Sequence, residues 1–469
     1  MLPKPRNLSI WPSVVPANKL SKMLITPNER AFLLFEGREY TVCVMPVDGD
    51  DYYVQESETF IVAASGGVLT FEYFFKNEQE YLIHLVYEEK VLQKFNVYSV
   101  GEDLYGLTPL KGDLHSHSYR SDGKRDPAAL AGHFREQGYD FLALTDHNRY
   151  YPGGEIDDVF KDVKCGITRV LGEEIHAPSL PVHVVHIGGS RGICEQIMSD
   201  REGYERETAA LLERIPKDIP EKYAERYAKV TWVTEKIHEA GGIAIFPHPF
   251  WRIRDKMYNV NSELSRIFLK SGLFDAYELV GGMPQADLNC SLAMWNDMRV
   301  EDGLNIPVVG SSDVHRTENS ETFPYYFTIA FAESNTNDAI KNAVKSSLCV
   351  AVEACGEEYD RQHRAYGSYR LVAYAQFLLK HYFPIRQRMC QGEGYAMRAY
   401  SMGEVSAQLV ELEASMAEDF SKRFFGRMAP VLPTPEVINF EEKWRAIHIE
   451  VGPITKGGGL DSDVVTRQI

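Results

Sequence analysis

Hydrophobic runs between residues 110 and 355 end repeatedly in histidines and carboxylates, and this pattern constrains the fold more than any other feature of the chain. The runs FLALT, GIAIF, FDAYELV and IPVVG alternate with segments of helical character. Such alternation is typical of a parallel α/β arrangement, and a barrel is plausible. In a barrel, polar residues at strand ends gather at one mouth, so these residues are expected to share a site.

Helix and strand signals outside these runs predict the rest of the architecture. Asp126 and Pro127 resemble an N-cap and a first-turn proline, so a helix is predicted over AALAGHFREQ, ending at Gly138. From about residue 7 to 105, short β-rich runs including FLLF, YTVCVMPV and EYLIHLVY predict a small β-sandwich. Beyond about residue 360 the pattern is mainly helical, and the glycine-rich end KGGGLDSDVVTRQI is predicted to be a mobile tail.

These patterns divide the chain of 469 residues into three predicted domains. A β-sandwich-like domain would occupy residues 1–108, an α/β domain residues 109–357, and a mainly helical region residues 358–469. A prior of roughly 150 residues per domain agrees with this number.

Charge and composition exclude several classes of function. The formal net charge of -17 disfavours broad docking onto polyanions, so no extensive nucleic-acid surface is expected. No apolar run suits a signal peptide or a membrane span, which predicts a cytoplasmic protein without membrane contact. The seven cysteines form no CxxC pair, so any metal must be held by nitrogen and oxygen ligands. The oligomeric state stays open.

The segment KGDLHSHS carries the first candidate ligands. In an extended strand His115 and His117 point to one face, where both can reach a single metal ion. An HxH pair alone is a modest signal, because two surface histidines on a strand have the same pattern.

Further motifs follow in the same order as the predicted strands. They are Ser121-Asp122-Gly123, LTDHN with His147, GEEIHA with Glu174, HVVHIGG with His183 and His186, FPHP with His248, and GSSDVHR with Asp313 and His315. Each apolar strand is expected to deliver its ligand at its C-terminal end. The ordered set indicates a metal site rather than isolated surface histidines.

From about residue 111 to 355 the chain resembles the polymerase and histidinol phosphatase (PHP) superfamily, whose motifs HxH, SDG, TDH, G-x-E, a strand histidine, HP and SDxH occur in this order. The resemblance covers roughly half of the chain. It implies a distorted (β/α)7 barrel with a trinuclear metal site at its C-terminal mouth. The SDG form resembles the phosphoesterase branch.

The resemblance also implies a distribution of ligands. One ion would be held by His115, His117, Glu174 and Asp313; a second would share Glu174 and take a strand histidine and His248; a third would take Asp122, His147 and His315. Imidazole and carboxylate ligands suit Mn, Fe or Zn, so two or three such divalent ions are expected per chain. A bridging carboxylate holds two divalent ions roughly 3.5 to 4 Å apart.

Two assignments leave alternatives open. Glu173 could replace Glu174, although the G-x-E spacing favours Glu174. His183 and His186 cannot both face inward on a flat strand, and the distance from Glu174 together with the following HIGG favours His186. Asp146 is a candidate for orienting His147 or its neighbour through a hydrogen bond outside the ligand set.

Other polar residues near the motifs have weaker signals. His133 and His238 lie within predicted helices and are expected to be solvated, whereas His176 is next to the site. Arg252 and Arg316 could hold a substrate phosphate through paired hydrogen bonds, or form surface salt bridges.

We expect Asp313, His315 and Arg252 to act in catalysis, with Glu278 a further candidate to point into the pocket.

The resemblance implies a phosphatase or phosphodiesterase that acts on a small phosphorylated molecule. A hydroxide bridging two ions would be the nucleophile, because a bound divalent metal lowers the pKa of water to near neutrality. The third ion, with a nearby arginine, would neutralise the phosphoryl oxygens. No GxGxxG, Walker-type or GxSxG motif occurs at these positions, which disfavours dehydrogenases, kinases and serine esterases.

Two alternatives stay open. The same ions could polarise a carbonyl group, which would make the protein a hydrolase of a carboxylic or carbamic ester. The chain could also be a non-catalytic binding protein whose barrel is supported by metal ions. The number of intact ligands argues against this second alternative, because buried ligands are costly to keep without use.

Overall fold

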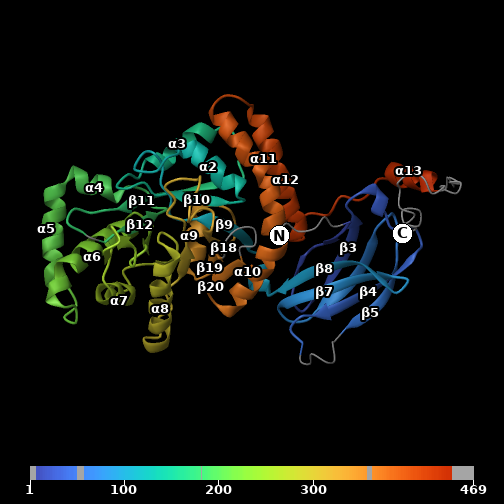
Figure 1. Ribbon diagram of the computed structural model, residues 1–469, viewed down its shortest axis with the longest axis horizontal. Helices are drawn as coiled ribbons and strands as arrows, with labels where there is room; N and C mark the ends of the chain where they lie inside the picture. The colour runs from blue at the N-terminus through green and yellow to red at the C-terminus, as the bar shows by residue number, and fades with distance from the viewer. Residues whose placement is uncertain (1–6, 50–56, 181, 356–361, 446–469) are drawn as a thin grey trace, which may run out of the picture.

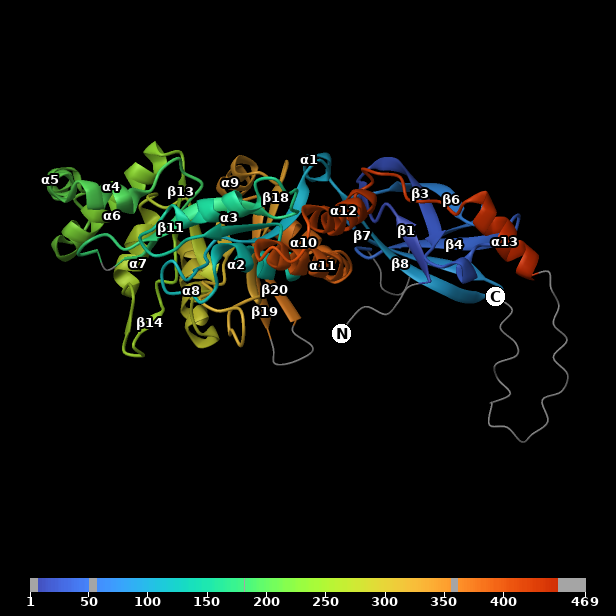
Figure 2. The same ribbon diagram turned by 90° about the horizontal axis from the view of Figure 1, so that it is seen from above.

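The computed structural model describes residues 7–49, 57–180, 182–355 and 362–445, which form an elongated molecule. In Figure 1 the N-terminal strands (blue) lie at one end of the long axis and the α/β region (green to yellow) at the other. The helices of residues 369–424 (orange) lie between them, and the turned view in Figure 2 shows the same order.

The N-terminal region contains two β-sheets with a common core. The three-stranded sheet has the order β1 (Leu8–Trp11), β3 (Lys19–Pro27), β6 (Leu69–Phe75). The five-stranded sheet has the order β2 (Val14–Pro16), β8 (Lys90–Val100), β7 (Gln79–Tyr87), β4 (Glu39–Pro46), β5 (Glu58–Ala63). Alternate side chains of β6 are buried, as expected for a strand with one face toward a core. Buried side chains of both sheets form one hydrophobic cluster.

The predicted strand FLLF is wrong. Arg30–Phe32 form a 3₁₀ turn, and the residues after it have no regular structure. Leu33 and Leu34 are nevertheless buried, so this apolar run fills the core without joining a sheet. The sequence also left β1 and β3 without a prediction.

A ten-stranded sheet forms the α/β region and curves into a nearly closed barrel. Its order is β17 (Val308–Gly310), β16 (Ala276–Val280), β13 (Ile243–Phe246), β12 (Val184–Ile187), β11 (Thr168–Ile175), β10 (Phe141–Leu144), β9 (Thr108–Asp113), β18 (Tyr326–Ala332), β19 (Cys349–Cys355), β20 (Gln362–Tyr366). The first strand in this order returns to the eighth, because Gly310 N donates to Thr328 Oγ1 at 3.1 Å and this hydroxyl donates to Gly310 O at 2.8 Å. Strands β14 (Arg252–Ile253) and β15 (Met257–Tyr258) form a separate hairpin.

The sheet is mixed, which differs from the expected parallel arrangement. Strands β9, β10 and β11 are parallel, as are β13, β16 and β17. Strand β12 is antiparallel to both neighbours, and β18, β19 and β20 are also antiparallel to theirs. The link between Ile175 and Val184 is too short for the helical crossover that two parallel strands need.

Helices surround the barrel. They are α1 (Glu102–Tyr105), α2 (Pro127–Glu136), α3 (Pro152–Phe160), α4 (Ile193–Ser199), α5 (Arg201–Leu211), α6 (Ala224–Glu239), α7 (Ser262–Lys270), α8 (Gln285–Glu301) and α9 (Asn337–Lys345). The predicted start of α2 is confirmed, because the Asp126 side chain accepts a hydrogen bond from Ala129 N and Pro127 is the first helical residue.

The predicted helical character of the C-terminal region is confirmed by α10 (Tyr369–His381), α11 (Phe383–Ser401), α12 (Ala407–Phe424) and α13 (Pro435–Arg445). Side chains from α10, α11 and α12 share one hydrophobic cluster with the barrel and with Val14 and Tyr98 of the N-terminal strands. Helix α11 also packs closely on α2, where a Cβ at Gly394 would lie 2.4 Å from Gly132 O.

Buried ion pairs join these helices to the barrel. Arg135 Nε of α2 lies 2.5 Å from Glu393 Oε2 of α11, and Arg386 of α11 pairs with Asp140. Among the described residues, no helix is long and apolar enough to cross a membrane. The predicted tail KGGGLDSDVVTRQI lies outside the described residues.

Candidate metal centre

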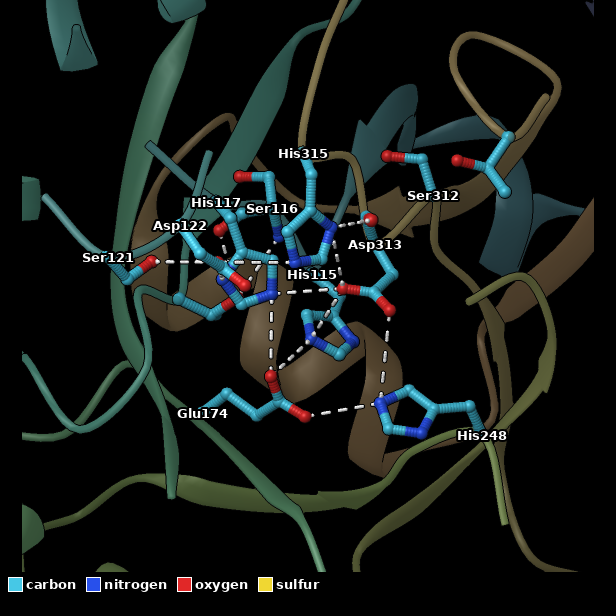
Figure 3. Close-up of polar contacts among 12 residues, drawn as sticks. His115, Ser116, His117, Ser121, Asp122, Glu174, His248, Ser312, Asp313 and His315 are labelled. Atoms are coloured by element: carbon cyan, nitrogen blue, oxygen red, sulfur yellow. Dashed lines mark hydrogen bonds and ion pairs between the residues drawn. The ribbon is translucent and has the colours of Figure 1, made fainter. Parts of the chain in front are cut away.

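The candidate ligands gather at one mouth of the barrel, where six strands supply them. His115 and His117 follow β9, His147 follows β10, Glu174 lies near the end of β11, His183 precedes β12, His248 follows β13, and Asp313 and His315 follow β17. Figure 3 shows the side chains of His115, His117, Glu174, His248, Asp313 and His315 converging on one another.

The first ligand group consists of His115, His117, Glu174 and Asp313. His115 Nε2 lies 3.3 Å from both Glu174 Oε2 and Asp313 Oδ1. His117 Nε2 lies 3.4 Å and 2.9 Å from the same two oxygens. Atoms bound to one ion at roughly 2.1 Å are roughly 3.0 to 3.4 Å apart in octahedral or tetrahedral geometry. These four atoms therefore have the spacing of a coordination shell.

The other carboxylate oxygen of Glu174 faces a second group. His183 Nδ1 lies 2.7 Å and His248 Nε2 lies 3.1 Å from Glu174 Oε1. His176 Nε2 is 3.7 Å from the same oxygen, and its ring stacks on that of His183. Because its two oxygens face different groups, Glu174 has the placement of a bridging carboxylate.

The third group, which contains Asp122, His147 and His315, is the most exposed. His147 Nε2 lies 3.4 Å from Asp122 Oδ2, and His315 Nε2 lies 3.3 Å from Asp122 Oδ1. His117 Nδ1 is 3.9 Å from Asp122 Oδ1, and the Asp122 side chain is 53% exposed. A ligand entering from solvent therefore meets this group first.

Unpartnered polar atoms show that the residues fit divalent cations. Several buried atoms of the cluster have no hydrogen-bond partner among the described residues: His115 Nε2, His117 Nε2, His147 Nδ1, His176 Nε2, His183 Nδ1 and Asp313 Oδ1. Buried polar atoms without partners are rare and costly in folded proteins. Imidazole and carboxylate donors in this number are the ligands that Mn, Fe and Zn take in proteins.

The pKa shifts in the cluster show how strongly it favours positive charge. Burial by itself raises the pKa of Glu174, but His183 and His115 outweigh burial and hold it well below its ordinary value. Burial lowers the pKa of His147, but Asp122 and Glu174 outweigh that effect and raise it to about 10. The carboxylates thus stay ionised and attract cations, whether protons or metal ions.

Supporting residues orient the ligands. Glu278 Oε2 lies 2.9 Å from His115 Nδ1, which leaves Nε2 of this ring to face the first group. The buried Asp113 carboxylate accepts from His115 N at 3.0 Å and from Ser312 N at 3.1 Å, so it ties two ligand loops together. Glu278 therefore lies at the site, as the sequence suggested.

Asp146 supports the loop that carries Asp122 rather than the imidazole ring of His147. Its carboxylate accepts from Ser118 N at 2.8 Å, from Ser118 Oγ at 2.7 Å and from Ser121 Oγ at 2.6 Å. The sequence suggested that Asp146 orients His147. In the structure its carboxylate instead holds the loop that carries Asp122.

Two ligands have strained backbones. His248 has φ of 25° and Asp313 has φ of 50°, a region that residues other than glycine rarely adopt. Asp313 N donates to His115 O at 2.9 Å, which helps to hold this conformation. Strain of this kind is typical of functional sites.

The preference for His186 over His183 is wrong. His186 is buried on the opposite face of β12, where its Nδ1 lies 3.1 Å from Glu173 Oε1. Because β12 is antiparallel to β11, its N-terminal end lies at the mouth, so His183 faces the site. Glu173 also accepts from Ile193 N and Cys194 N at the start of α4, which leaves Glu174 as the residue at the mouth.

We predict that His183→Ala removes metal and lowers activity at least about tenfold, because the side chain lies against the bridging carboxylate. His186→Ala is the matched variant, and it should keep its metal and lose stability instead, since it opens a buried cavity beside Glu173. Elemental analysis and thermal unfolding of both variants check this. Metal loss from His186→Ala alone would reverse the assignment.

In the described part of the chain, neither arginine predicted to hold phosphate forms an ion pair with a carboxylate of the ligand groups. Arg252 Nε is 3.0 Å from Asp287 Oδ1, and its half-exposed side chain lines a separate surface cavity beside the β14–β15 hairpin. Arg316 is exposed. A catalytic role for Arg252 stays a prediction that this placement does not support.

Two other histidines belong to no ligand group, and the expectation that both are solvated fits His238, whose side chain is 41% exposed, better than His133, whose side chain is 16% exposed. His133 Nδ1 lies 3.6 Å from Glu136, and His238 Nε2 lies 2.8 Å from Asp275.

The sequence predicted no definite role at the site for His176 or Asp113. His176 follows GEEI directly. The segment between His176 and His183 is too short for a parallel crossover, and this length was the signal that β11 and β12 are antiparallel with both histidines at the mouth. Asp113 lies next to the HxH motif, but its bond to Ser312 joins residues 199 positions apart. No local pattern predicts such a contact.

A cavity of about 700 Å³ opens beside the cluster. Asp313 and His315 line it together with Trp251, Gln285 and Tyr326. Its wall also includes Ser320, Glu321 and Thr322, and no lysine or arginine lines it within the described chain. A substrate could therefore reach the ligand groups past His315.

Comparisons with known proteins give a local sequence similarity and several structural likenesses. No protein-family model matches the sequence. The chain is 40% identical over 58 residues to the DNA polymerase/3'-5' exonuclease PolX of Bacillus subtilis, a match that spans 12% of this chain and 10% of PolX.

Among solved structures, a two-domain protein from Bacteroides vulgatus containing a predicted PHP-like metal-dependent phosphoesterase matches with a TM-score of 0.35 and 19% identity. This match covers 52% of the chain and 65% of the other protein. A candidate metal-dependent phosphoesterase from Bifidobacterium adolescentis has a TM-score of 0.33 and 20% identity, covering 50% of this chain and 96% of that one.

An amidohydrolase from Chromobacterium violaceum, with bound sulfate and no metal, has a TM-score of 0.31 and 19% identity over 45% of this chain and 89% of its own. The ordered motifs and the ligand groups that they form resemble those of the polymerase and histidinol phosphatase (PHP) superfamily, and the local similarity to PolX covers 10% of that protein.

Proposed function

We propose that the protein is a metal-dependent phosphoesterase that hydrolyses a small phosphorylated substrate at a trinuclear centre. The observation that carries this proposal is the position of Glu174, whose two oxygens face separate histidine groups. The third group, at the exposed rim, would complete the centre.

The ligand assignments follow from the three groups. The first ion would take His115, His117, Glu174 and Asp313; the second Glu174, His183 and His248, with His176 beside it; the third Asp122, His147 and His315. Bound divalent ions supply Lewis acidity, activation of water near neutral pH and neutralisation of phosphoryl oxygens. Mn, Fe and Zn all suit these donors.

The residues of the chain position these groups and admit the substrate. Glu278 keeps the proton of His115 on Nδ1, so Nε2 presents its lone pair to the first group. His315 Nδ1 lies 2.9 Å from Asp313 O, which fixes the ring so that Nε2 faces Asp122. Because Asp313 and His315 line the cavity, we propose that they lie next to the bound phosphoryl group.

The domain division 1–108, 109–357 and 358–469 is part of the same proposal. The first domain, proposed as a small β-sandwich, supplies none of the ligands, and the second, proposed as a distorted (β/α)7 barrel, supplies them all. The third supplies helices that are joined to the barrel region by the ion pairs of Arg135 and Arg386.

The purified protein is expected to contain two or three ions of Mn, Fe or Zn per chain, because the ligands form three groups. Chelation should abolish hydrolysis of an aryl phosphate, and Mn should restore it. Elemental analysis, followed by turnover on phosphomonoesters, phosphodiesters and aryl carboxylic esters, tests the proposal. Fewer than one ion per chain, or faster turnover of the carboxylic esters, would contradict it.

His133→Ala provides a negative control for histidine substitutions. This side chain is on α2, where its Nδ1 is 3.6 Å from Glu136, and it belongs to no ligand group. We expect unchanged metal content and nearly unchanged kcat/KM, since the partner Glu136 also lies outside the ligand groups. Loss of metal in this variant would show that histidine substitution perturbs the centre without direct ligation.

A further inference from the structure

A half-open groove of about 750 Å³ lies between the N-terminal strands and the C-terminal helices, and none of its lining residues belongs to a metal-ligand group. Strand β1 and helices α10, α11 and α12 all contribute to it, which places it where these elements meet in Figure 2. We refer to it as the α11–α12 groove. Its volume is in the range of sites that hold small organic ligands.

The groove has a mainly apolar wall. Trp11 and Met389 contribute partly exposed apolar surfaces; Ile385 and Met416 extend the wall, together with the nearly buried Phe420, Ile10 and Phe424. The Met416 side chain is 51% exposed, and Met389 and Trp11 are half-buried. An occupant with an apolar tail would cover these side chains and gain free energy in proportion to the area buried.

Three cationic side chains line the same groove, one from each of the helices α10, α11 and α12. They are Lys380 of α10, Arg388 of α11 and Arg423 of α12. None of the three has a carboxylate partner within 4 Å in the described part of the chain, whereas the nearby Arg135, Arg386 and Arg398 each have one. Glu413 is the single acidic residue of the lining. This local excess of cations stands out in a chain whose net charge is -17.

Arg423 gives the most specific observation. Its Nε is buried and has no hydrogen-bond partner among the described residues. The guanidinium lies over the Trp11 ring, with Cζ 6.0 Å from the ring centroid. A guanidinium N–H left without an acceptor in a groove is suited to a charge-assisted hydrogen bond from an anionic ligand.

We propose that the α11–α12 groove binds a small amphipathic carboxylate, whose apolar tail packs on Trp11, Met389 and Phe420 and whose anionic head pairs with Arg423 and Arg388. The tail accounts for the apolar wall and the head for the unpaired cations. Such a ligand would bridge β1, α11 and α12 and so stabilise the packing of the N-terminal strands on the helices.

Calorimetric titration of the full chain with octanoate tests the proposal. One saturable site is expected, with a dissociation constant in the millimolar range or below. Octanol retains the tail without the charge and acetate retains the charge without the tail, and each should bind about tenfold more weakly. Equal binding of octanol and octanoate, or no saturable binding of octanoate, would overturn the proposal.

Variants connect the binding to the groove. Arg423→Gln is expected to weaken octanoate binding about tenfold, because it removes a charge-assisted hydrogen bond. Arg388→Gln changes an exposed side chain and should weaken binding in the same direction if Arg423→Gln proves unstable. Arg214→Gln is the matched control, since this arginine is exposed and does not line the groove. Unchanged affinity in both groove variants would place the octanoate elsewhere and refute the site.

Discussion

Replacing Glu174 by Gln is expected to lower kcat/KM for an aryl phosphate at least about a thousandfold, which corresponds to roughly 4 kcal/mol of transition-state stabilisation. The side chain is buried, and its two oxygens lie within 3.4 Å of His115, His117, His183 and His248. The amide has nearly the same shape but carries no negative charge. It also presents an NH₂ group to nitrogen atoms that need an acceptor or a shared cation.

The metal content of this variant separates a loss of ligation from a loss of chemistry. We expect Glu174→Gln to lose at least one ion per chain, because one carboxylate serves two groups. Glu213→Gln is the matched control, since Glu213 is exposed and belongs to no ligand group. A Glu174→Gln protein that keeps all its ions and more than about a tenth of its activity would refute the bridging role.

Glu393→Gln is expected to destabilise the protein by about 3 to 5 kcal/mol. The Glu393 carboxylate is fully buried between Arg135 Nε, at 2.5 Å, and Gly166 N, at 2.5 Å. An amide can satisfy only one of these two donors well, and the Arg135 charge would lose its main partner. Removing one partner of a buried pair is costly because the other charge stays out of water.

Urea unfolding of Glu393→Gln checks this value, with Glu404→Gln as the control, because Glu404 is exposed in the turn that follows the same helix. Because Glu393 lies outside the ligand groups, the folded variant should keep its metal and most of its activity. A change below about 1 kcal/mol would mean that Asp140, 3.4 Å from Arg135, compensates for the lost charge.

Local sequence determined the composition of the site. The HxH, TDH, HP and SDxH motifs each lie within a few residues of a strand end, and SDG lies in the loop that follows HxH, so their residues reach the mouth wherever the strand is placed in the barrel. Seven of the predicted ligands come together in the first and third ligand groups: His115, His117, Asp122, His147, Glu174, Asp313 and His315. Local signals also predicted α2, because an N-cap depends only on neighbouring residues.

Tertiary structure decided what depends on strand direction and on distant partners. The choice between His183 and His186 followed from the reversal of β12, which brings the start of this strand to the mouth and sends His186 to Glu173. The spacing of residues in a helix or strand decides on which face a side chain lies. The direction of the strand decides which of its two ends lies at the mouth of the barrel.

Contacts between residues far apart in the chain had no local signal. Glu278 meets His115 across 163 positions, and Glu393 meets Arg135 across 258. Arg252 pairs with Asp287 instead of facing the ligands next to it in sequence. The sequence by itself determined which groups this protein can offer to metal ions, because ligand chemistry belongs to residue type and local spacing. Only the packed fold decided which of them face one another, because burial and long-range pairing are set by the arrangement of the strands.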